Sequence, residues 1–364
     1  MTTSDRPGAG PAEEAAFESL QLPLGMPSEP ASASAEPAAQ VPSEAELPSQ
    51  AEVPSEAQVP SEAGPPGGSD ASEAGLSGRG FATEAVKSAD PARTRPRRPL
   101  VQPEPLDHHG PARVIALCNQ KGGVGKTTST INLGAALTEF GRRVLLVDFD
   151  PQGALSVGLG VQPHQLERTT YNLLMERSVG IDEVLLKTGV PGMDLLPSNI
   201  DLSAAEIQLV NEVAREQSLA RTLAPVLNDY DFVLIDCQPS LGLLTVNALT
   251  AANGVIIPLE CEFFSLRGVA LLIDTIDKVQ QRLNPRLRLE GILATMYDGR
   301  TLHGREVYSR VLEAFGDKVF DTVITRTVRF PETTVAGEPI TTWAPTSNGA
   351  VAYRELAMEV LSRP

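Results

Sequence analysis

The sequence predicts an α/β fold in which a mostly parallel, twisted sheet is flanked by helices on both faces and preceded by a long, disordered N-terminal tail. From about residue 112 onward, short apolar segments alternate with segments whose apolar residues recur at helical intervals. The short segments are apolar throughout, which is typical of strands covered on both faces in a parallel sheet. We therefore expect two parts, a tail over residues 1–110 and a folded domain over residues 111–364.

The tail differs from the rest in composition. It holds 17 of the 30 prolines, and its 17 Asp+Glu against 7 Lys+Arg give a net charge of −10. From Val41 to Gly64 a six-residue repeat runs VPSEAE, LPSQAE, VPSEAQ, VPSEAG. Proline at every sixth position interrupts a helix, and Ser, Glu and Ala offer too little apolar surface to offset the ordering entropy, so disorder is expected to about residue 105. The tail is either an acidic spacer or a docking segment, and its basic cluster RTRPRRP (93–99) either contacts nucleic acid or balances the acidic stretch.

Charge and cysteine content narrow the function classes. Residues 111–364 hold 29 Asp+Glu and 23 Lys+Arg, a net charge of −6, so binding to nucleic acid would require a local basic patch. Cys118, Cys237 and Cys261 form neither a disulfide framework nor a close-spaced metal pattern, which fits a reducing compartment. No apolar run approaches the roughly 20 residues that span a bilayer, and the first residues lack the order of a secretion signal. We expect a soluble, cytoplasmic protein.

The elements of the domain can be placed in order. The expected strands are RVIALCN (113–119), RVLLVDFD (143–150), MDLLP (193–197), DFVLIDC (231–237), GVIIPLE (254–260) and RLEGILATMYD (288–298). The expected helices are TTSTINLGAALTEFG (127–141), LGLLTVNALTAAN (241–253), LRGVALLIDTIDKVQQRL (266–283) and AVAYRELAMEVLSR (350–363). The first helix closes on a glycine, and the last is expected to close the domain.

The strongest motif is NQKGGVGKTT at residues 119–128, between the first strand and the first helix. It is a variant of the common P-loop, G-x-x-x-x-G-K-[ST], because Gln120 stands where that pattern has glycine. Its glycines allow backbone N–H groups to turn toward phosphate oxygens, and the helix N-terminus adds a partial positive charge. Lys126 is expected to reach the β- and γ-phosphates of a nucleotide, and Thr127 to offer its hydroxyl to Mg²⁺.

The string KGGVGKTT, with a lysine in its first position, resembles the deviant Walker A motif of the ParA and MinD group of P-loop ATPases. The resemblance to the ParA/Soj family spans residues 112–361. In that family the first lysine, here Lys121, reaches across a dimer interface to the phosphates bound by the partner, so the resemblance implies an ATP-dependent homodimer in which Lys121 and Lys126 are catalytic. The implied cofactors are ATP and Mg²⁺, and the implied nucleotide-binding residues are Lys121, Gly122, Gly123, Val124, Gly125, Lys126, Thr127 and Thr128.

Two aspartates end the second strand. The segment RVLLVDFDPQG (143–153) is similar to the switch I region of the family, and this match assigns Asp150 to the metal site and to positioning or activating the attacking water. It places Asp148 in the surroundings of the Mg²⁺ ion. A carboxylate near the γ-phosphate requires the metal and the lysines to offset its charge. In isolation such a pair could equally cap a helix, but its place after a P-loop favours the catalytic interpretation.

The segment DFVLIDCQPSLG (231–242) resembles the Walker B motif. Four apolar residues place Asp236 at the carboxyl edge of a buried strand, within reach of Mg²⁺ through water, which completes an expected metal set of Thr127, Asp150 and Asp236. The family more often has Asp-Cys-Pro-Pro-Ser here, and Gln238 replaces the first of these prolines. Cys237 is interpreted as a buried thiol without a redox role.

Two later segments match family signatures. ATMYDGRT (294–301) ends a strand where the family contacts adenine, which assigns Met296 and Asp298 to the nucleotide, while RTVRFPETTVAGEP (326–339) resembles a later loop. By position, Arg300 and Arg329 match arginines that bind DNA without sequence preference in the family. The chain departs from the family at three places, reading Glu332-Thr333-Thr334, Gly337-Glu338-Pro339 and Ser347-Asn348-Gly349-Ala350 for Glu-Ala-Pro, Gly-Lys-Pro and Ser-Arg-Gly-Ala. The last two departures each remove a positive charge.

The resemblance implies a DNA-segregation ATPase that dimerises on ATP, binds double-stranded nucleoid DNA non-specifically, and is released when a ParB-like partner stimulates hydrolysis. A MinD-like membrane-cycling ATPase is a weaker interpretation, because such proteins end in a basic amphipathic helix and this chain ends MEVLSRP. An iron–sulfur reductase would require two cluster cysteines at a dimer axis, which Cys118 and Cys237 do not fit. A family member that positions a protein cargo stays open.

Overall fold

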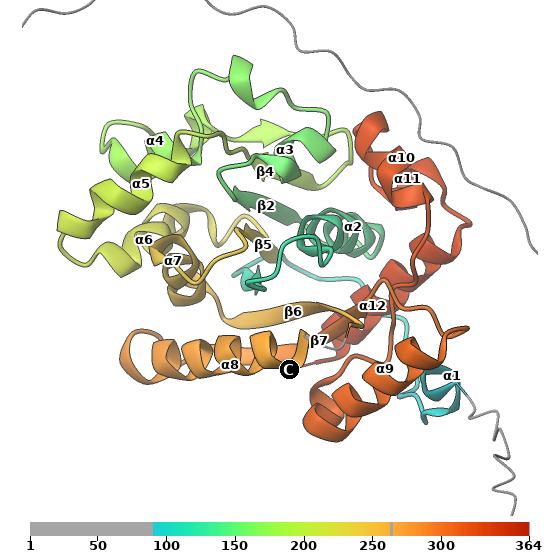
Figure 1. Cartoon of the computed structure of the whole chain (residues 1–364). Coiled ribbons are helices and arrows are strands. Elements are labelled where there is room, and N and C mark those ends of the chain that lie inside the picture. Colours follow the sequence, from blue (N-terminus) through green and yellow to red (C-terminus); the bar gives the residue numbers. More distant parts are fainter. Residues whose placement is uncertain (1–89, 263–264, 364) are drawn as a thin grey trace, which may run out of the picture. The chain divides into compact units, whose positions relative to one another are not determined.

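The structure is a computed structural model that describes residues 90–262 and 265–363 (Figure 1). The expected disorder of the tail and the six-residue repeat fall on residues outside this range. Among the described residues, no helix combines the length and the apolar character needed to cross a membrane.

A seven-stranded sheet with strand order β3-β4-β2-β5-β1-β6-β7 forms the centre of the described domain (Figure 1). Its strands are β1 Arg113–Leu117, β2 Val144–Phe149, β3 Leu186–Lys187, β4 Met193–Leu196, β5 Phe232–Cys237, β6 Gly254–Glu260 and β7 Arg288–Thr295. All neighbouring pairs are parallel except β3 and β4, which are antiparallel. The expected mostly parallel sheet is confirmed, and a short antiparallel edge strand adds to it.

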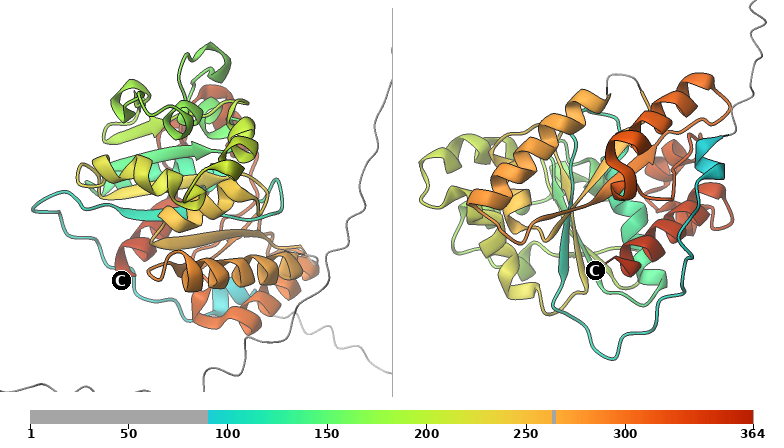
Figure 2. Two further views of the ribbon diagram at one scale, coloured as in Figure 1. Left: turned by 90° about the vertical axis from the view of Figure 1, so that its left-hand side faces the viewer. Right: turned by 90° about the horizontal axis from the view of Figure 1, so that it is seen from below.

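Helices cover both faces of this sheet (Figure 2). They are α1 Pro91–Thr94, α2 Lys126–Glu139, α3 Ala154–Gly158, α4 Thr170–Met175, α5 Leu202–Gln208, α6 Ser218–Leu223, α7 Leu243–Ala251, α8 Ser265–Arg282, α9 Leu302–Phe315, α10 Arg329–Ala336, α11 Ile340–Trp343 and α12 Asn348–Ser362. One apolar core joins the sheet to α5, α6, α7, α8 and α9. A second core, on the other face, joins it to α2, α3, α11 and α12.

Strand β1 shows why the strands must be apolar throughout. Val114 and Ala116 belong to the first core, whereas Ile115 and Leu117 belong to the second. Successive side chains of a strand point to opposite faces, so a sheet with helices on both sides buries every position. The same geometry brings the carboxyl ends of the parallel strands to one edge, where ligands bind in open α/β sheets.

The structure moves the start of the domain toward the N-terminus. The sequence assigns residues 90–110 to the tail, but residues 90–111, which we call the N-terminal strap, contact the domain at both ends, while residues 96–102 and 104–108 are exposed. Ala92 of the strap is buried in the first core. At its other end, Gly110 N donates to Asp231 Oδ1 at 3.0 Å, and His109 Nδ1 lies 2.8 Å from Asp231 Oδ2. This polar segment is ordered because its backbone and side chains find partners on the domain, which composition does not reveal.

Candidate nucleotide-binding site

The glycine-rich segment turns between β1 and α2 at the carboxyl edge of the sheet. Gly123 and Gly125 have φ angles of +76° and +84°, in the left-handed region that favours glycine. Neighbouring strands hold the turn: Asn119 Nδ2 donates to the Pro258 carbonyl at 2.7 Å, and Thr295 Oγ1 donates to the Val124 carbonyl at 2.9 Å. The turn leads into the N-terminus of a 14-residue helix, a favourable setting for phosphate oxygens.

Lys126 and Thr127 open α2 with their side chains at this turn. Lys126 is buried, and its Nζ donates to the Lys121 carbonyl at 3.3 Å. Thr127 Oγ1 donates to Asp236 Oδ2 at 2.6 Å. The structure thus joins the P-loop and Walker B residues directly, although they are 109 positions apart.

Two fully buried carboxylates lie side by side behind Thr127. In the β2–β5 register Asp148 is paired with Asp236. Asp148 accepts from Ser156 N at 2.8 Å and Ser156 Oγ at 2.7 Å, yet burial raises its pKa to about 7. Burial, followed by the charge of Asp148, raises the pKa of Asp236 to about 8. Two adjacent carboxylates in low dielectric disfavour ionisation, and a cation beside them would relieve that cost.

The donor set fits Mg²⁺. Asp236 Oδ1 is buried without a hydrogen-bond partner in the described structure, so this oxygen is available to a metal-bound water. The Thr127 hydroxyl adjoins the same carboxylate. No group of three or more His, Cys, Asp or Glu side chains among the described residues could hold a metal alone. Mg²⁺ is commonly held by one or two protein oxygens, with water and nucleotide phosphates completing its shell, and Thr127 with Asp236 could hold it so.

Asp150 follows β2 at the same edge of the sheet. Its Oδ1 accepts from Gln152 N at 3.0 Å, and its backbone N donates to Asp148 Oδ1 at 3.3 Å. The side chain is largely buried. Its negative charge contributes to the raised pKa of Asp236, which indicates that the two carboxylates share one local environment.

Lys121 is paired within its own chain. Its Nζ lies 2.9 Å from Glu260 Oε2 and 2.5 Å from Glu262 Oε2. The hydrogen bond to Glu262 raises the pKa of Lys121 and holds the ammonium charged. Glu260 also binds Arg326, whose Nη2 lies 3.0 Å from Glu260 Oε1. These two glutamates were not predicted from the sequence. Their position at or just after the end of β6 is the feature that could have indicated them.

An apolar cavity of about 330 Å³ adjoins the P-loop and suits a flat base. It is lined by Gly125, Thr128, Thr295, Met296, Ile324, Thr325, Arg326, Thr327, Phe330, Pro331, Thr334 and Tyr353. Met296, which was predicted to contact the base, lines this cavity. Phe330 and Pro331 of α10 also line it but were not predicted, although both lie in the segment RTVRFPETT that resembles a family loop. Asp298 is not among the lining residues; it binds Arg300 instead, with Nε–Oδ1 and Nη2–Oδ2 distances of 2.8 Å each.

The two predicted DNA-binding arginines are both exposed. Arg300 pairs with Asp298, and Arg329 lies 4.0 Å from Glu332. Arg300 lines a cavity of about 620 Å³ and Arg329 a neighbouring one of about 730 Å³. Arg326 and Asn348 line both cavities, so the two arginines belong to one continuous surface.

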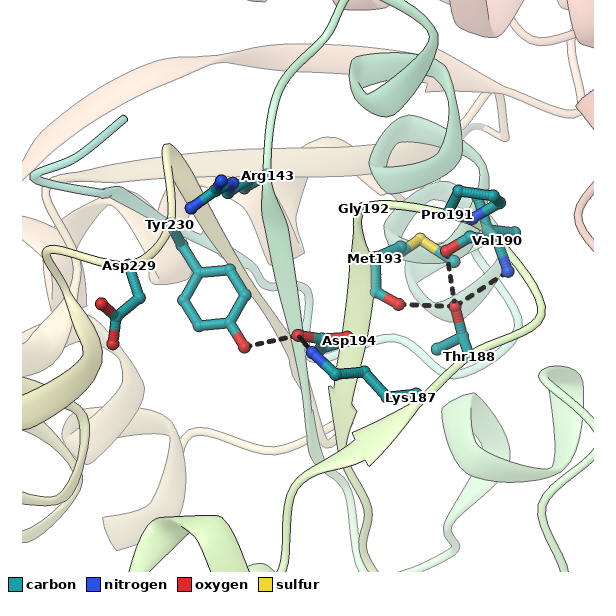
Figure 3. A pocket seen from close by; sticks show the side chains of 10 residues that line it. All are labelled: Arg143, Lys187, Thr188, Val190, Pro191, Gly192, Met193, Asp194, Asp229 and Tyr230. Atoms are coloured by element: carbon teal, nitrogen blue, oxygen red, sulfur yellow. Dashed lines mark hydrogen bonds and ion pairs between the residues drawn. The ribbon is translucent and has the colours of Figure 1, made fainter. Parts of the chain in front are cut away.

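A separate cavity of about 470 Å³ lies at the opposite, amino edge of the sheet (Figure 3). Its polar groups bind one another: Lys187 Nζ and the Tyr230 hydroxyl both donate to Asp194 Oδ2 at 2.7 Å. None of the predicted site residues lines it. We assign the nucleotide to the carboxyl edge, where the P-loop and the aspartates meet.

Comparisons with known proteins agree with this geometry. Residues 112–289 match a family model described as an AAA domain. The chain is 48% identical over 248 residues to the sporulation initiation inhibitor protein Soj of Bacillus subtilis, covering 68% of this chain and 98% of that protein. It is also 48% identical over 255 residues to the chromosome partitioning protein ParA of Caulobacter vibrioides, covering 70% of this chain and 95% of that protein.

A solved structure of a similar protein contains a nucleotide and magnesium. A protein of Mycobacterium smegmatis described as cobyrinic acid a,c-diamide synthase, with bound ADP and magnesium, is 47% identical and has a TM-score of 0.60. The match covers 68% of this chain and 92% of that chain.

Proposed function

The chain belongs to the ParA/Soj family of P-loop ATPases and uses ATP and Mg²⁺; from this premise we propose that it is a DNA-segregation switch that pairs on ATP. The ATP dimer binds nucleoid DNA without sequence preference, and a ParB-like partner releases it by stimulating hydrolysis. The observation that carries the proposal is Lys121, a second lysine at the P-loop whose partly exposed ammonium lies beside Glu260 and Glu262.

Each residue of the site has one task in this proposal. The backbone of residues 121–128 and the Lys126 ammonium bind the β- and γ-phosphates. Thr127 and Asp236 hold the metal, and Mg²⁺ supplies charge neutralisation on the transferring phosphoryl group. Asp150 orients the attacking water at the same edge, while Met296 contacts the base. Asp298 is better placed to fix Arg300 than to touch nucleotide.

Dimerisation depends on nucleotide because Lys121 contacts the phosphates bound by the partner subunit. A lysine donated across an interface lowers the free energy of a bound triphosphate only when two subunits close over it. The pairs with Glu260 and Glu262 must then open. They are partly exposed, and such pairs contribute little stability, so exchange for phosphate oxygens is favourable.

DNA binding rests on local charge in an acidic chain. Arg300 and Arg329 lie on one exposed surface, which is sufficient for phosphate contacts. Glu338 and Asn348, where relatives carry Lys and Arg, reduce the number of such contacts. We therefore expect weaker DNA binding than in relatives that keep those charges, with a flatter dependence on salt.

The test is co-sedimentation of the full chain with double-stranded DNA in the presence of ATP, ADP or no nucleotide. We expect binding with ATP only, and its loss in Arg300→Ala and Arg329→Ala while the ATP dimer persists. Equal binding in all three nucleotide states would exclude the switch. Flotation with liposomes in the presence of ATP would instead indicate a membrane-cycling protein, and ATP pairing without DNA binding would favour a protein cargo.

A further inference from the structure

The N-terminal strap carries two arginines to the rim of the cavity that Arg300 lines. We propose that Arg93 and Arg97 belong to the DNA-binding surface and contact phosphates together with Arg300 and Arg326. This inference rests on the proposed function, and it deepens it by assigning the surface to a segment N-terminal to the matched ATPase domain.

The start of the strap is fixed on the loop that follows β7. Asp90 caps α1 by accepting from Ala92 N at 3.1 Å, and it also accepts from the Tyr297 hydroxyl. A Cβ atom at Gly299 would lie 2.3 Å from Asp90 Oδ2, so glycine leaves room for the Asp90 carboxylate there. Helix α1 lies beside α9 (Figure 1), and its Ala92 is buried in the core. The strap and the Arg300 loop therefore form one surface.

Alternate arginines of the strap have different tasks. Arg95 points inward: its Nη1 donates to the Val319 carbonyl at 3.2 Å, and its Nε lies 3.3 Å from Asp321. Arg98 N donates to Asp321 Oδ2 at 2.9 Å, which holds the backbone on both sides of Arg97. The side chains of Arg93 and Arg97 are 86% and 43% exposed. A fixed backbone thus presents two arginines to solvent.

These two side chains line a cavity of about 620 Å³ built from four parts of the chain. Among its lining residues are four arginines and two aspartates: Arg93, Arg97, Arg300, Arg326, Asp90 and Asp298. Arg93 Nε lies 3.6 Å from Asp90 Oδ2 and Arg300 pairs with Asp298, so the four arginines outnumber the two aspartates by two formal charges. The lining is therefore net positive on a domain that is acidic as a whole.

The exposure of the arginines favours a polyanion over a single small anion. Arg93 and Arg300 are 86% and 90% exposed, too open to exclude water from a lone phosphate. The ion pairs of the arginines on this surface are exposed, as is the pair of Arg97 with Glu355 at 3.5 Å. Exposed ion pairs contribute little stability and readily exchange for phosphate oxygens. Through Arg326 the surface continues to Arg329. Double-stranded DNA offers repeated phosphates along such a surface.

The experiment measures DNA binding of the full chain by fluorescence anisotropy, with Mg²⁺ and a non-hydrolysable ATP analogue. We expect the Arg93→Ala/Arg97→Ala variant to bind roughly five- to tenfold more weakly and the slope of log affinity against log salt to fall by about 0.9 per lost contact. Arg93→Lys/Arg97→Lys should keep most of the slope. The matched control is Arg282→Ala/Arg286→Ala, which removes two charges near the amino end of β7, at the opposite edge of the sheet, and should leave binding unchanged.

The outcomes separate the inference from its premise. If the unaltered chain shows no ATP-dependent DNA binding, the proposed function fails. If the unaltered chain binds and Arg300→Ala weakens it, but the strap variant has the affinity and slope of the unaltered chain, the inference alone is overturned. A strap variant no weaker than the Arg282/Arg286 control would also overturn it, because the loss would then reflect net charge only.

Discussion

Asp148 and Asp236 make the metal-free site dependent on pH. Their folded-state pKa values are raised to about 7 and about 8 from an ordinary value of 3.8. The folded chain then holds protons that the unfolded chain releases, so stability is expected to fall as pH rises from about 4 to about 8. Thermal unfolding without Mg²⁺ across this range measures the effect.

Two controls identify the carboxylates. Asp236→Asn removes one buried charge and should flatten the decline, whereas Asp274→Asn, on the exposed surface of α8, should not. Mg²⁺ with ADP should restore stability at high pH in the unaltered chain. A melting temperature that rises with pH in the metal-free chain would contradict the assignment.

The pair between Lys121 and Glu262 sets how readily Lys121 is released. Glu262→Gln removes the carboxylate at 2.5 Å, so less free energy is needed to move Lys121 toward a partner subunit. Exposed pairs contribute about 0.2–1 kcal/mol each and the dimer opens two of them, which predicts a dimer roughly two- to thirtyfold tighter with a non-hydrolysable ATP analogue. Analytical ultracentrifugation measures this, with Asp274→Asn as control. A weaker dimer would show that Glu262 serves the closed state instead.

At the level of single residues, the sequence predicted some of the site and missed the rest for a physical reason. Lys126, Thr127 and Asp236 belong to motifs whose spacing implies proximity, and the structure brings them together. Phe330 lines the apolar cavity and Glu262 pairs with Lys121 only because tertiary packing brings them there. Motif spacing cannot reveal such contacts, because they join segments with no fixed separation along the chain.

At the scale of elements, the apolar runs in the sequence were sufficient to predict the main strands. All six expected strands form, because each is an apolar run that can only be satisfied between two helical layers. The two-residue β3 and the short helices α4 and α5 lack such a run, and their positions depend on caps and local packing. The N-terminal strap was missed because its proline-rich, charged composition resembles the tail that precedes it.

The strap offers a prediction about docking. Ala92→Asp places a carboxylate in the first core, which costs more than the roughly 1–3 kcal/mol of an unpaired buried neutral polar group, so we expect the strap to detach. Limited trypsin digestion should then cleave the Arg97–Arg98 bond faster, since Arg98 N loses its hydrogen bond to Asp321. Thr94→Asp, at an exposed position of the same helix, is the control. Equal cleavage of the two variants would mean that the strap is not held by Ala92.

At the scale of the whole molecule, charge is unevenly divided. Residues 1–89 hold 14 Asp+Glu and 3 Lys+Arg, a net charge of −11, against −16 for the chain. They join the domain at Asp90, a residue of the arginine-lined cavity. Because these residues are covalently joined to the domain at that point, we expect them to compete with DNA phosphates for the surface.

Removing residues 1–89 is therefore expected to strengthen ATP-dependent DNA binding, most at low salt and least at about 200 mM, because the competition is electrostatic and screened. Anisotropy across a salt series measures it. A matched variant carries a Gly/Ser segment of the same length in place of residues 1–89, so that charge is separated from bulk. If charge is the cause, this variant behaves like the truncated chain; if it behaves like the unaltered chain, excluded volume accounts for the effect. Unchanged affinity in both would show that the acidic residues do not act on this surface.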